Sequence, residues 1–215
     1  MGDKLTPEEE QEIKNKIEEN SKQQNKIIVG FFIFVGVVAI VITAWIFISY
    51  MGSHVSYRGI EFDVVDEIAP YRITLPINAG GGITGSVVKE NDFYFYLRND
   101  PRDLEAIEFD ADIVFLKDMV LSMPDSLHCE GDSIISIANL ARLYQVLGTI
   151  VIKDENAGCD DQGRYVFLEI QEGEETKITQ TGPSCYLISV NNCEILPATE
   201  KFMVESFIEV KKIVP

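Results

Sequence analysis

The sequence predicts an α/β or α+β domain that follows one N-terminal membrane-spanning helix. Three observations lead to this fold class. A run of 24 residues, from Ile27 to Tyr50, contains no charged side chain. After it, several short stretches alternate apolar and polar residues, a pattern typical of half-buried strands. A helical pattern over 133–147 lies between two strand patterns, which predicts a β-α-β unit in a mixed sheet.

The chain divides into four expected regions. We expect a cytoplasmic helical head over 1–26, a transmembrane helix over 27–50, a linker over 51–57 and one globular domain over 58–215. A helix of the length of the second region measures about 36 Å, whereas the hydrocarbon core of a bilayer is about 30 Å thick. The apolar run also exceeds the apolar part of a cleaved signal peptide, which is about 7–15 residues long. We therefore interpret it as an uncleaved signal-anchor that holds the chain in the lipid bilayer.

Basic residues around the span predict its orientation. Four lysines precede it at close range, at positions 14, 16, 22 and 26, whereas the first base after it is Arg58 and the next is Arg72. Cytoplasmic flanks are enriched in Lys and Arg, and acidic residues contribute little to this preference. The rule places the head in the cytoplasm and the domain on the extracytoplasmic side of the cell membrane.

The charge of the chain excludes some partners. The formal net charge is −17, and the residues after the span hold 13 Lys and Arg against 28 Asp and Glu, a charge of −15. An acidic surface of this kind repels the phosphates of nucleic acids and the head groups of anionic lipids. We therefore expect no nucleic-acid partner and a domain that does not lie flat on anionic lipid.

All four cysteines, Cys129, Cys159, Cys185 and Cys193, follow the span. They show no C-x-x-C spacing, so a metal site is disfavoured, and no metal or other cofactor is expected. An even number of cysteines on one side of a membrane favours two disulfides in an oxidising compartment. The alternative is four free, buried cysteines in a reducing compartment. Of the three possible pairings, we prefer Cys159–Cys185 with Cys129–Cys193, and only the first of these bonds has a topological argument.

Strand and helix patterns fill the domain. The helix over 133–147 is apolar on most sides, which predicts a buried helix. The last three strand patterns are separated by tight turns and predict an antiparallel meander, and Pro197 introduces a C-terminal helix to about residue 213 that should cover one side of the domain. The expected strands are 60–64, 71–77, 93–97, 113–120, 149–153, 165–171, 176–180 and 185–190.

Two clusters of charged residues are candidate binding sites. The first is Arg98, Asp100 and Arg102, which either binds an acidic partner or forms local salt bridges and helix caps, and we prefer the second interpretation. The other is Asp110-Ala111-Asp112, a D-x-D pair that holds a divalent cation in some glycosyltransferases and is otherwise a pair of solvated acids. Neither cluster forms a set of nucleophile, base and acid, so no catalytic residue is predicted.

Two segments carry a resemblance to a known group. They are 96–102, with the sequence YLRNDPR, and 185–196, with the sequence CYLISVNNCEIL. Both are similar to parts of uncharacterised, single-pass, membrane-anchored proteins of small-genome archaea, over about residues 90–210. The resemblance implies an anchored domain, and it implies no activity.

Three functions remain open on these grounds. The first is an envelope protein that displays a disulfide-stabilised acidic domain outside the cell for binding or assembly, with another envelope protein or a glycan as partner. The second is an anchored enzyme that acts on glycans through carboxylates such as those of Asp110 and Asp112. The third is a pilin-like filament subunit. We favour the first, because the sequence contains an anchor and a domain but no catalytic signature.

Overall fold

The computed structural model describes residues 29–48, 52–65, 67–78, 90–124, 126–127 and 129–213, with only the backbone described at 76–78 and 90–92. The chain divides into two compact units, residues 1–52 and residues 53–215, and each is considered by itself. The predicted head over 1–26 lies outside the described residues.

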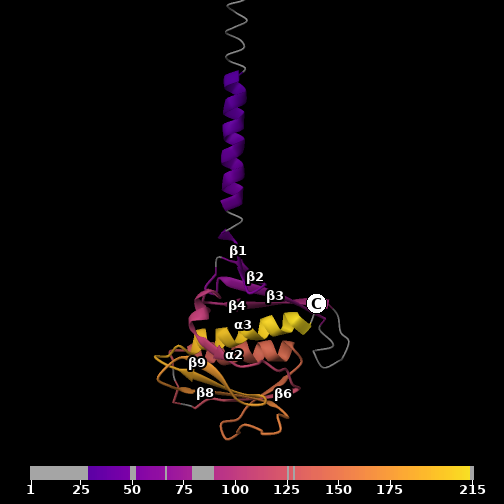
Figure 1. The fold of residues 1–215 in the computed structure, drawn as a ribbon, viewed down its shortest axis with the longest axis vertical. Helices are drawn as coiled ribbons and strands as arrows, with labels where there is room; N and C mark the ends of the chain where they lie inside the picture. The colour runs from indigo at the N-terminus through magenta and orange to yellow at the C-terminus, as the bar shows by residue number, and fades with distance from the viewer. Residues whose placement is uncertain are drawn as a thin grey trace, which may run out of the picture. The chain divides into compact units, whose positions relative to one another are not determined.

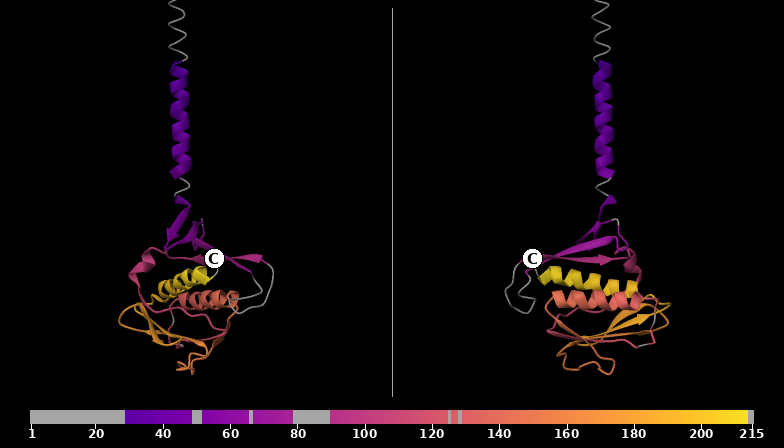
Figure 2. Two further views of the ribbon diagram at one scale, coloured as in Figure 1. Left: turned by 45° about the vertical axis from the view of Figure 1, so that its right-hand side comes forward. Right: turned by 180° about the vertical axis from the view of Figure 1, so that it is seen from behind.

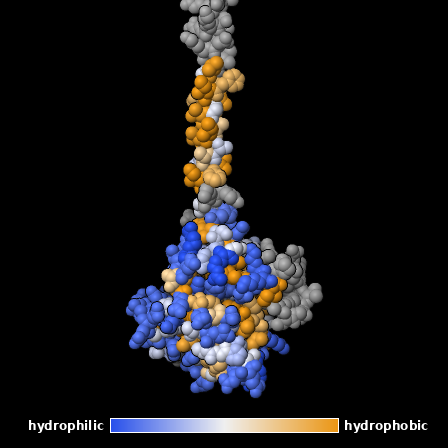
Figure 3. All heavy atoms as spheres, in the orientation of Figure 1, coloured by the Kyte–Doolittle hydropathy of each residue, from blue (hydrophilic) through white to orange (hydrophobic). Residues whose placement is uncertain are grey.

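The described part of the first unit is one helix, Val29–Ile48, which is long and apolar enough to cross a membrane. Its 20 residues correspond to about 30 Å of helix. All of its side chains are exposed, and Figure 3 shows the apolar ones as an orange column. The hydroxyl of Thr43 donates to the carbonyl oxygen of Ala39 at 2.7 Å, so this polar group is satisfied within the helix. The two predicted residues beyond each end lie outside the described residues.

The second unit has three layers, which Figures 1 and 2 show from three directions. A four-stranded antiparallel sheet lies on one side, two helices form the middle layer, and a six-stranded mixed sheet lies on the other side. This is the α+β class that the sequence predicts, with the mixed sheet and the C-terminal helix in place.

The four-stranded sheet consists of β1 (His54–Tyr57), β2 (Ile60–Val64), β3 (Tyr71–Asn78) and β4 (Glu90–Leu97), in that order. β1 corrects the predicted linker over 51–57, because its four residues pair with β2. The turn between them has φ values of +47° and +84° at positions 58 and 59, as a two-residue hairpin turn requires. Alternate residues of β1 are polar, so the sequence did not indicate a strand here. The last side chain of β1 is nevertheless buried.

The six-stranded sheet has the strand order β5-β9-β10-β8-β6-β7. The predicted β-α-β unit is confirmed, because β6 (Asp118–Ser122) and β7 (Ile150–Lys153) are parallel neighbours joined by α2 (Asp132–Val146). The remaining strands are β5 (Glu108–Asp110), β8 (Val166–Glu172), β9 (Lys177–Gly182) and β10 (Cys185–Val190).

The last three strands differ from the predicted meander in one pairing. β9 and β10 form the expected antiparallel pair, but β8 pairs with β10, in parallel, and not with β9. The turn after β8 crosses the end of β10, where the Gly173 N–H donates to the carbonyl oxygen of Val190 at 2.9 Å. A Cβ at Gly173 would lie 1.8 Å from the Ser189 hydroxyl oxygen, so this crossing depends on glycine. From the sequence, the same turn looks like an ordinary hairpin connection.

The strand predicted over 113–120 begins later, at the first residue of β6, and residues 111–117 form no strand. Backbone groups of this segment form hydrogen bonds with a side chain instead of with a neighbouring strand. The Tyr186 hydroxyl accepts from the Val114 N–H at 2.9 Å and donates to the Asp112 carbonyl oxygen at 2.8 Å. The three-residue strand β5, which pairs in parallel with β9, was not predicted.

The C-terminal helix is more deeply buried than the sequence suggests, and α2 is less deeply buried. α3 (Ile195–Ile213) lies in the middle layer, and 14 of its 19 residues are buried. α2 has five buried residues and carries Ile134 with 76% of its surface exposed. The C-terminal helix is therefore the centre of the domain and not a cover on one side of it, because sheets lie on both of its faces (Figure 2).

Aromatic side chains of α3 join the three layers. Phe202 packs against Tyr186 of β10, with ring centroids 5.4 Å apart, and against Tyr144 of α2 at 6.4 Å. Phe207, one and a half turns further along, packs against Phe95 of β4 at 5.6 Å. Large buried rings contribute strongly to a core, so α3 is the element on which both sheets depend.

Candidate functional site

Two disulfides cross-link the second unit. Cys159 is bonded to Cys185 and Cys129 is bonded to Cys193, with Cα–Cα distances of 5.6 Å and 5.4 Å. These are the two pairs that the sequence analysis prefers. No cysteine in the described part of the chain is free.

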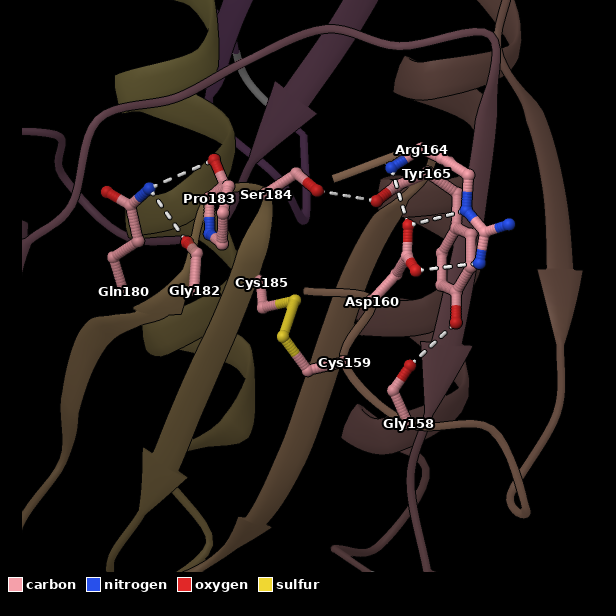
Figure 4. The surroundings of a disulfide bond; sticks show 10 residues. All are labelled: Gly158, Cys159, Asp160, Arg164, Tyr165, Gln180, Gly182, Pro183, Ser184 and Cys185. Atoms are coloured by element: carbon pink, nitrogen blue, oxygen red, sulfur yellow. Dashed lines mark hydrogen bonds and ion pairs between the residues drawn. A yellow bond between two sulfur atoms is a disulfide. The ribbon is translucent and has the colours of Figure 1, made fainter. Parts of the chain in front are cut away.

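Figure 4 shows how the loop before β8 is held beside the first residue of β10. The parallel pairing aligns Cys185 with a residue of β8, so both strands begin at the same edge of the sheet. Around Cys159, the Asp160 carboxylate accepts from the Arg164 guanidinium at 2.8 Å, and the Tyr165 hydroxyl donates to the Gly158 carbonyl oxygen at 2.7 Å. The disulfide therefore closes a loop that polar contacts already order.

Gly182 lies directly against this disulfide, which gives a testable prediction. A Cβ at this position would lie 2.7 Å from the Cys159 Sγ and 3.3 Å from the Cys185 Sγ. We expect Gly182→Ala to lower the free energy of unfolding by about 1–3 kcal/mol, because overpacking forces neighbouring atoms to move. Urea denaturation followed by circular dichroism measures the loss.

The matched control is the same substitution in a Cys159→Ala/Cys185→Ala background, from which both sulfur atoms are absent. In that background we expect Gly182→Ala to lower the free energy of unfolding by less than half as much, because the effects of substitutions at contacting residues are not additive. An equal cost in the two backgrounds would show that the sulfur contact is not the cause.

Arg98, Asp100 and Arg102 form contacts within the domain, as the preferred interpretation of this cluster expects. The Asp100 carboxylate accepts from the Arg102 guanidinium at 2.5 Å and from the Tyr71 hydroxyl of β3 at 3.0 Å. Arg98 reaches Asp132, at the first residue of α2, at 3.4 Å. These contacts fasten the segment after β4 to two other elements, and a 3₁₀ turn, η1 (Asp103–Ala106), follows.

Glu200 of α3 holds the same segment from inside the domain. It is 1% exposed, and its carboxylate accepts from the backbone N–H of Arg98 at 2.7 Å and from that of Asn99 at 3.0 Å. Burial raises the pKa of the Glu200 carboxyl, and the hydrogen bonds from Arg98 and Asn99 act in the opposite direction. The sequence analysis did not identify this residue.

The ion pairs of Asp100 and Asp160 predict a dependence of stability on pH. Hydrogen bonds from Arg102 and Arg164 lower the pKa of these two carboxyls to about 2, from a usual value of 3.8. A lowered pKa in the folded state means that the stabilisation is complete above about pH 4 and is lost as the pH falls to about 2. We expect the urea midpoint of the parent protein to fall over this range. The urea midpoint of Asp100→Asn/Asp160→Asn should fall less steeply. Equal slopes for the two proteins would contradict the assignment.

Asp110 and Asp112 lie at the end of β5 and just after it, where they border two adjoining pockets. Asp112 lines a pocket of about 400 Å³, and both residues line a shallower one of about 380 Å³. Among the described residues, no group of three or more His, Cys, Asp or Glu side chains could hold a metal ion. Within that part of the chain, the D-x-D pair has no further ligands of the kind that a cation site needs.

The larger pocket, which we call the charged pocket, is the candidate functional site. It lies between the β1–β2 turn, the segment from η1 to Ile113, and α3. Its acidic lining residues are Glu105, Glu108, Asp112, Glu205 and Glu209. Its basic lining residues are Arg58, Lys201 and Lys212.

A buried ion pair forms one wall of the charged pocket. The Lys201 ammonium lies 3.0 Å from the Glu205 carboxylate, and these side chains are 4% and 8% exposed. Arg58, in the β1–β2 turn, pairs with the same carboxylate at 2.5 Å and keeps half of its side chain exposed. The Lys201 ammonium also lies 6.0 Å from the centroid of the Tyr57 ring, a cation–π distance. One carboxylate thus holds two cations between α3 and the first hairpin.

A second part of the lining of the charged pocket, the segment from η1 to Ile113, carries carboxylates with no cation among the described residues. Glu105, Glu108 and Asp112 are exposed, and none has a salt bridge to a residue that the structure describes. Lys212, the remaining base, pairs with Glu209. The pocket therefore presents N–H donors from one part of its lining and free carboxylate oxygens from another.

Sequence reasoning found Asp112 but missed the other residues of the charged pocket. Arg58 was counted only as a flanking base, and Lys201 and Glu205 were not singled out on the C-terminal helix, which was expected to cover one side of the domain. Their spacing of four residues on a strongly apolar helix was the available signal, because charged residues are almost never fully buried unless paired.

Comparisons with models of protein families, with curated proteins and with solved structures found no match.

Proposed function

We propose that this chain is a single-pass membrane protein whose second unit is held on the extracytoplasmic side, where its charged pocket binds a partner from the cell envelope. One apolar helix and two disulfides in the unit that follows it support an anchored, disulfide-stabilised domain. The disulfides are the observation that carries the proposal, because such bonds persist in oxidising compartments and are rare in the cytosol.

Basic residues support the same side of the membrane. The lysines at 14, 16, 22 and 26 precede the apolar helix, and the first base that follows it is Arg58. That arginine is paired with a buried carboxylate of the folded domain. Cysteines and lysines are independent sets of residues, and both favour a cytoplasmic N-terminus.

The pocket supports a binding role. Its one buried carboxylate, that of Glu205, is paired with two cations through its Oε1 atom. The carboxylates of Glu105, Glu108 and Asp112 are exposed and free to accept hydrogen bonds. An arrangement of fixed donors and free acceptors is suited to recognition of a polar partner.

Protease treatment of intact cells tests the placement. The full chain would carry one epitope tag at each end, and we expect external protease to remove the C-terminal tag and leave the N-terminal tag intact. Thiol labelling of the same cells, lysed in a denaturant, should modify no cysteine without reductant and four with it. A protected C-terminal tag, or four thiols that react without reductant, would overturn the proposal.

The matched control changes orientation without changing the domain. Replacing the lysines at 14, 16, 22 and 26 with glutamine, and inserting four lysines after residue 52, reverses the charge asymmetry. We expect this variant to expose its N-terminal tag and to contain free thiols. A domain that stays outside would show that the lysines do not determine orientation.

A further inference from the structure

We propose that the charged pocket binds a neutral saccharide unit, an inference that rests on the proposed binding function. Two properties of the pocket support this class of ligand. It offers the N–H donors of Lys201 and Arg58, and it offers carboxylate acceptors that have no cation partner among the described residues. A sugar ring has hydroxyl groups that both donate and accept.

Lys201 and Arg58 supply the donors. An ammonium has three N–H groups, and in the described part of the chain Lys201 has one ion-pair partner, Glu205. The side chain is 4% exposed and lines the pocket, so a buried donor left without an acceptor would be costly. The half-exposed guanidinium of Arg58 has five N–H donors, of which one nitrogen faces Glu205. Hydroxyl oxygens of a ligand would accept from both groups.

Glu105, Glu108 and Asp112 supply the acceptors. Ionised carboxylates only accept, with two oxygens each, and hydrogen bonds to a charged acceptor are about twice as strong as neutral ones. These residues have no cation partner in the part of the chain that the structure describes. Hydroxyl groups of a ligand that occupies the pocket would donate to them.

The charges of the pocket favour a neutral sugar over an anion or a cation of similar size. An anion would enter a pocket with five acids and three bases, on a domain of charge −15, and would be repelled. A cation such as a polyamine would meet the carboxylates but also Lys201 and Arg58, and it has no acceptor for their N–H groups. A neutral polyol can both accept from the N–H groups and donate to the carboxylates.

The size of the pocket agrees with one or two sugar units. Its volume is about 400 Å³, near the lower end of the range of about 300–1,000 Å³ for small-molecule pockets. Such a site would hold the terminal unit of a glycan and leave the rest of the chain in solvent.

Saturation-transfer NMR tests the inference on the full chain in lipid nanodiscs, since detergents with sugar head groups would compete. The probes are the methyl glycosides of glucose, galactose and mannose and that of N-acetylglucosamine, with putrescine and methyl phosphate, whose carbon-bound protons can be observed, as charged probes. We expect transfer to at least one glycoside at millimolar concentration and none to methyl phosphate. Transfer to putrescine alone would identify a cation site and overturn the proposal, as would the absence of transfer to every glycoside.

Variants locate the binding. Glu108→Ala/Asp112→Ala should weaken glycoside binding about tenfold, as expected for lost hydrogen bonds to charged groups. Arg58→Gly should weaken it several-fold, and glycine suits the left-handed backbone at this position, where φ is +47°. The matched control, Asp161→Ala/Glu174→Ala, removes the same charge from exposed positions outside the pocket and should bind as the parent does. Equal weakening by the two double variants would assign the effect to net charge.

The placement experiment separates the two proposals. A domain that is extracytoplasmic and disulfide-bonded, yet transfers no saturation to a glycoside, would reject the saccharide and keep the anchored display. A domain with reduced thiols on the cytoplasmic side would reject the placement even if a glycoside bound.

Discussion

Glu205→Ala is expected to lower the free energy of unfolding by about 3–5 kcal/mol, the cost of leaving a buried charge without its partner. Among the residues that the structure describes, Glu205 supplies the one carboxylate that pairs with the Lys201 ammonium, and the Lys201 side chain is 4% exposed. Its removal also releases Arg58, so the β1–β2 turn loses its ion pair with α3. Urea denaturation of the full chain, followed by far-UV circular dichroism, measures the loss.

Two further variants identify the cause of that loss. Glu209→Ala, one turn further along α3, removes an ion pair with the exposed Lys212 and should cost less than about 1 kcal/mol. Lys201→Met/Glu205→Leu replaces the buried pair with apolar side chains and should recover most of the stability. If the double variant is as unstable as Glu205→Ala, the loss comes from packing and not from an unpaired charge.

Local patterns in the sequence predict the elements of this fold well. Alternating residues in β2 and β3 identify strands, because a strand places successive side chains on opposite faces. The β6–α2–β7 unit follows from one helical pattern between two strand patterns, since parallel strands need a crossover. These features depend on residues that are close together in the chain.

Features that depend on distant residues could not be predicted in the same way. The β8–β10 pairing is an example, because the turn after β8 has the composition of an ordinary hairpin turn, and its contact with Ser189 exists only in the folded chain. The predicted disulfide of Cys159 was nevertheless found, since a meander and the observed order both bring the starts of β8 and β10 to the same edge.

The central position of α3 and the charged pocket were missed for a related reason. Lys201 and Glu205 appear in the sequence as the polar side of an amphipathic helix, and one side in solvent was the natural interpretation. That interpretation is wrong because a second sheet covers this side of the helix. β1 and its turn bring Arg58 and Tyr57 onto the same helix face. Three strands of this sheet were predicted, but β1 was expected to be linker, so no pattern indicated that its turn would reach this face of the helix.

The second large effect is expected at the other disulfide. Cys129→Ala/Cys193→Ala should lower the free energy of unfolding by about 4 kcal/mol, since the bond closes a loop with a sequence separation of 64. The same change at Cys159 and Cys185, whose separation is 26, should cost about 3.5 kcal/mol by the same chain-entropy model. Equilibrium urea denaturation compares both double variants with the oxidised parent.

The backbone around the Cys129–Cys193 bond predicts a larger difference between the two double variants than loop length alone does. Glu130, Asn192 and Cys193 have φ values of +46°, +48° and +61°, left-handed conformations that cost energy in non-glycine residues and persist only when the surroundings hold them. The bond joins the segment before α2 to the segment before α3, so its removal frees both from these conformations. We therefore expect faster amide hydrogen exchange at the first turns of α2 and α3 in this variant only. Equal protection of those amides in the two double variants would show that the strained backbone is held by other contacts.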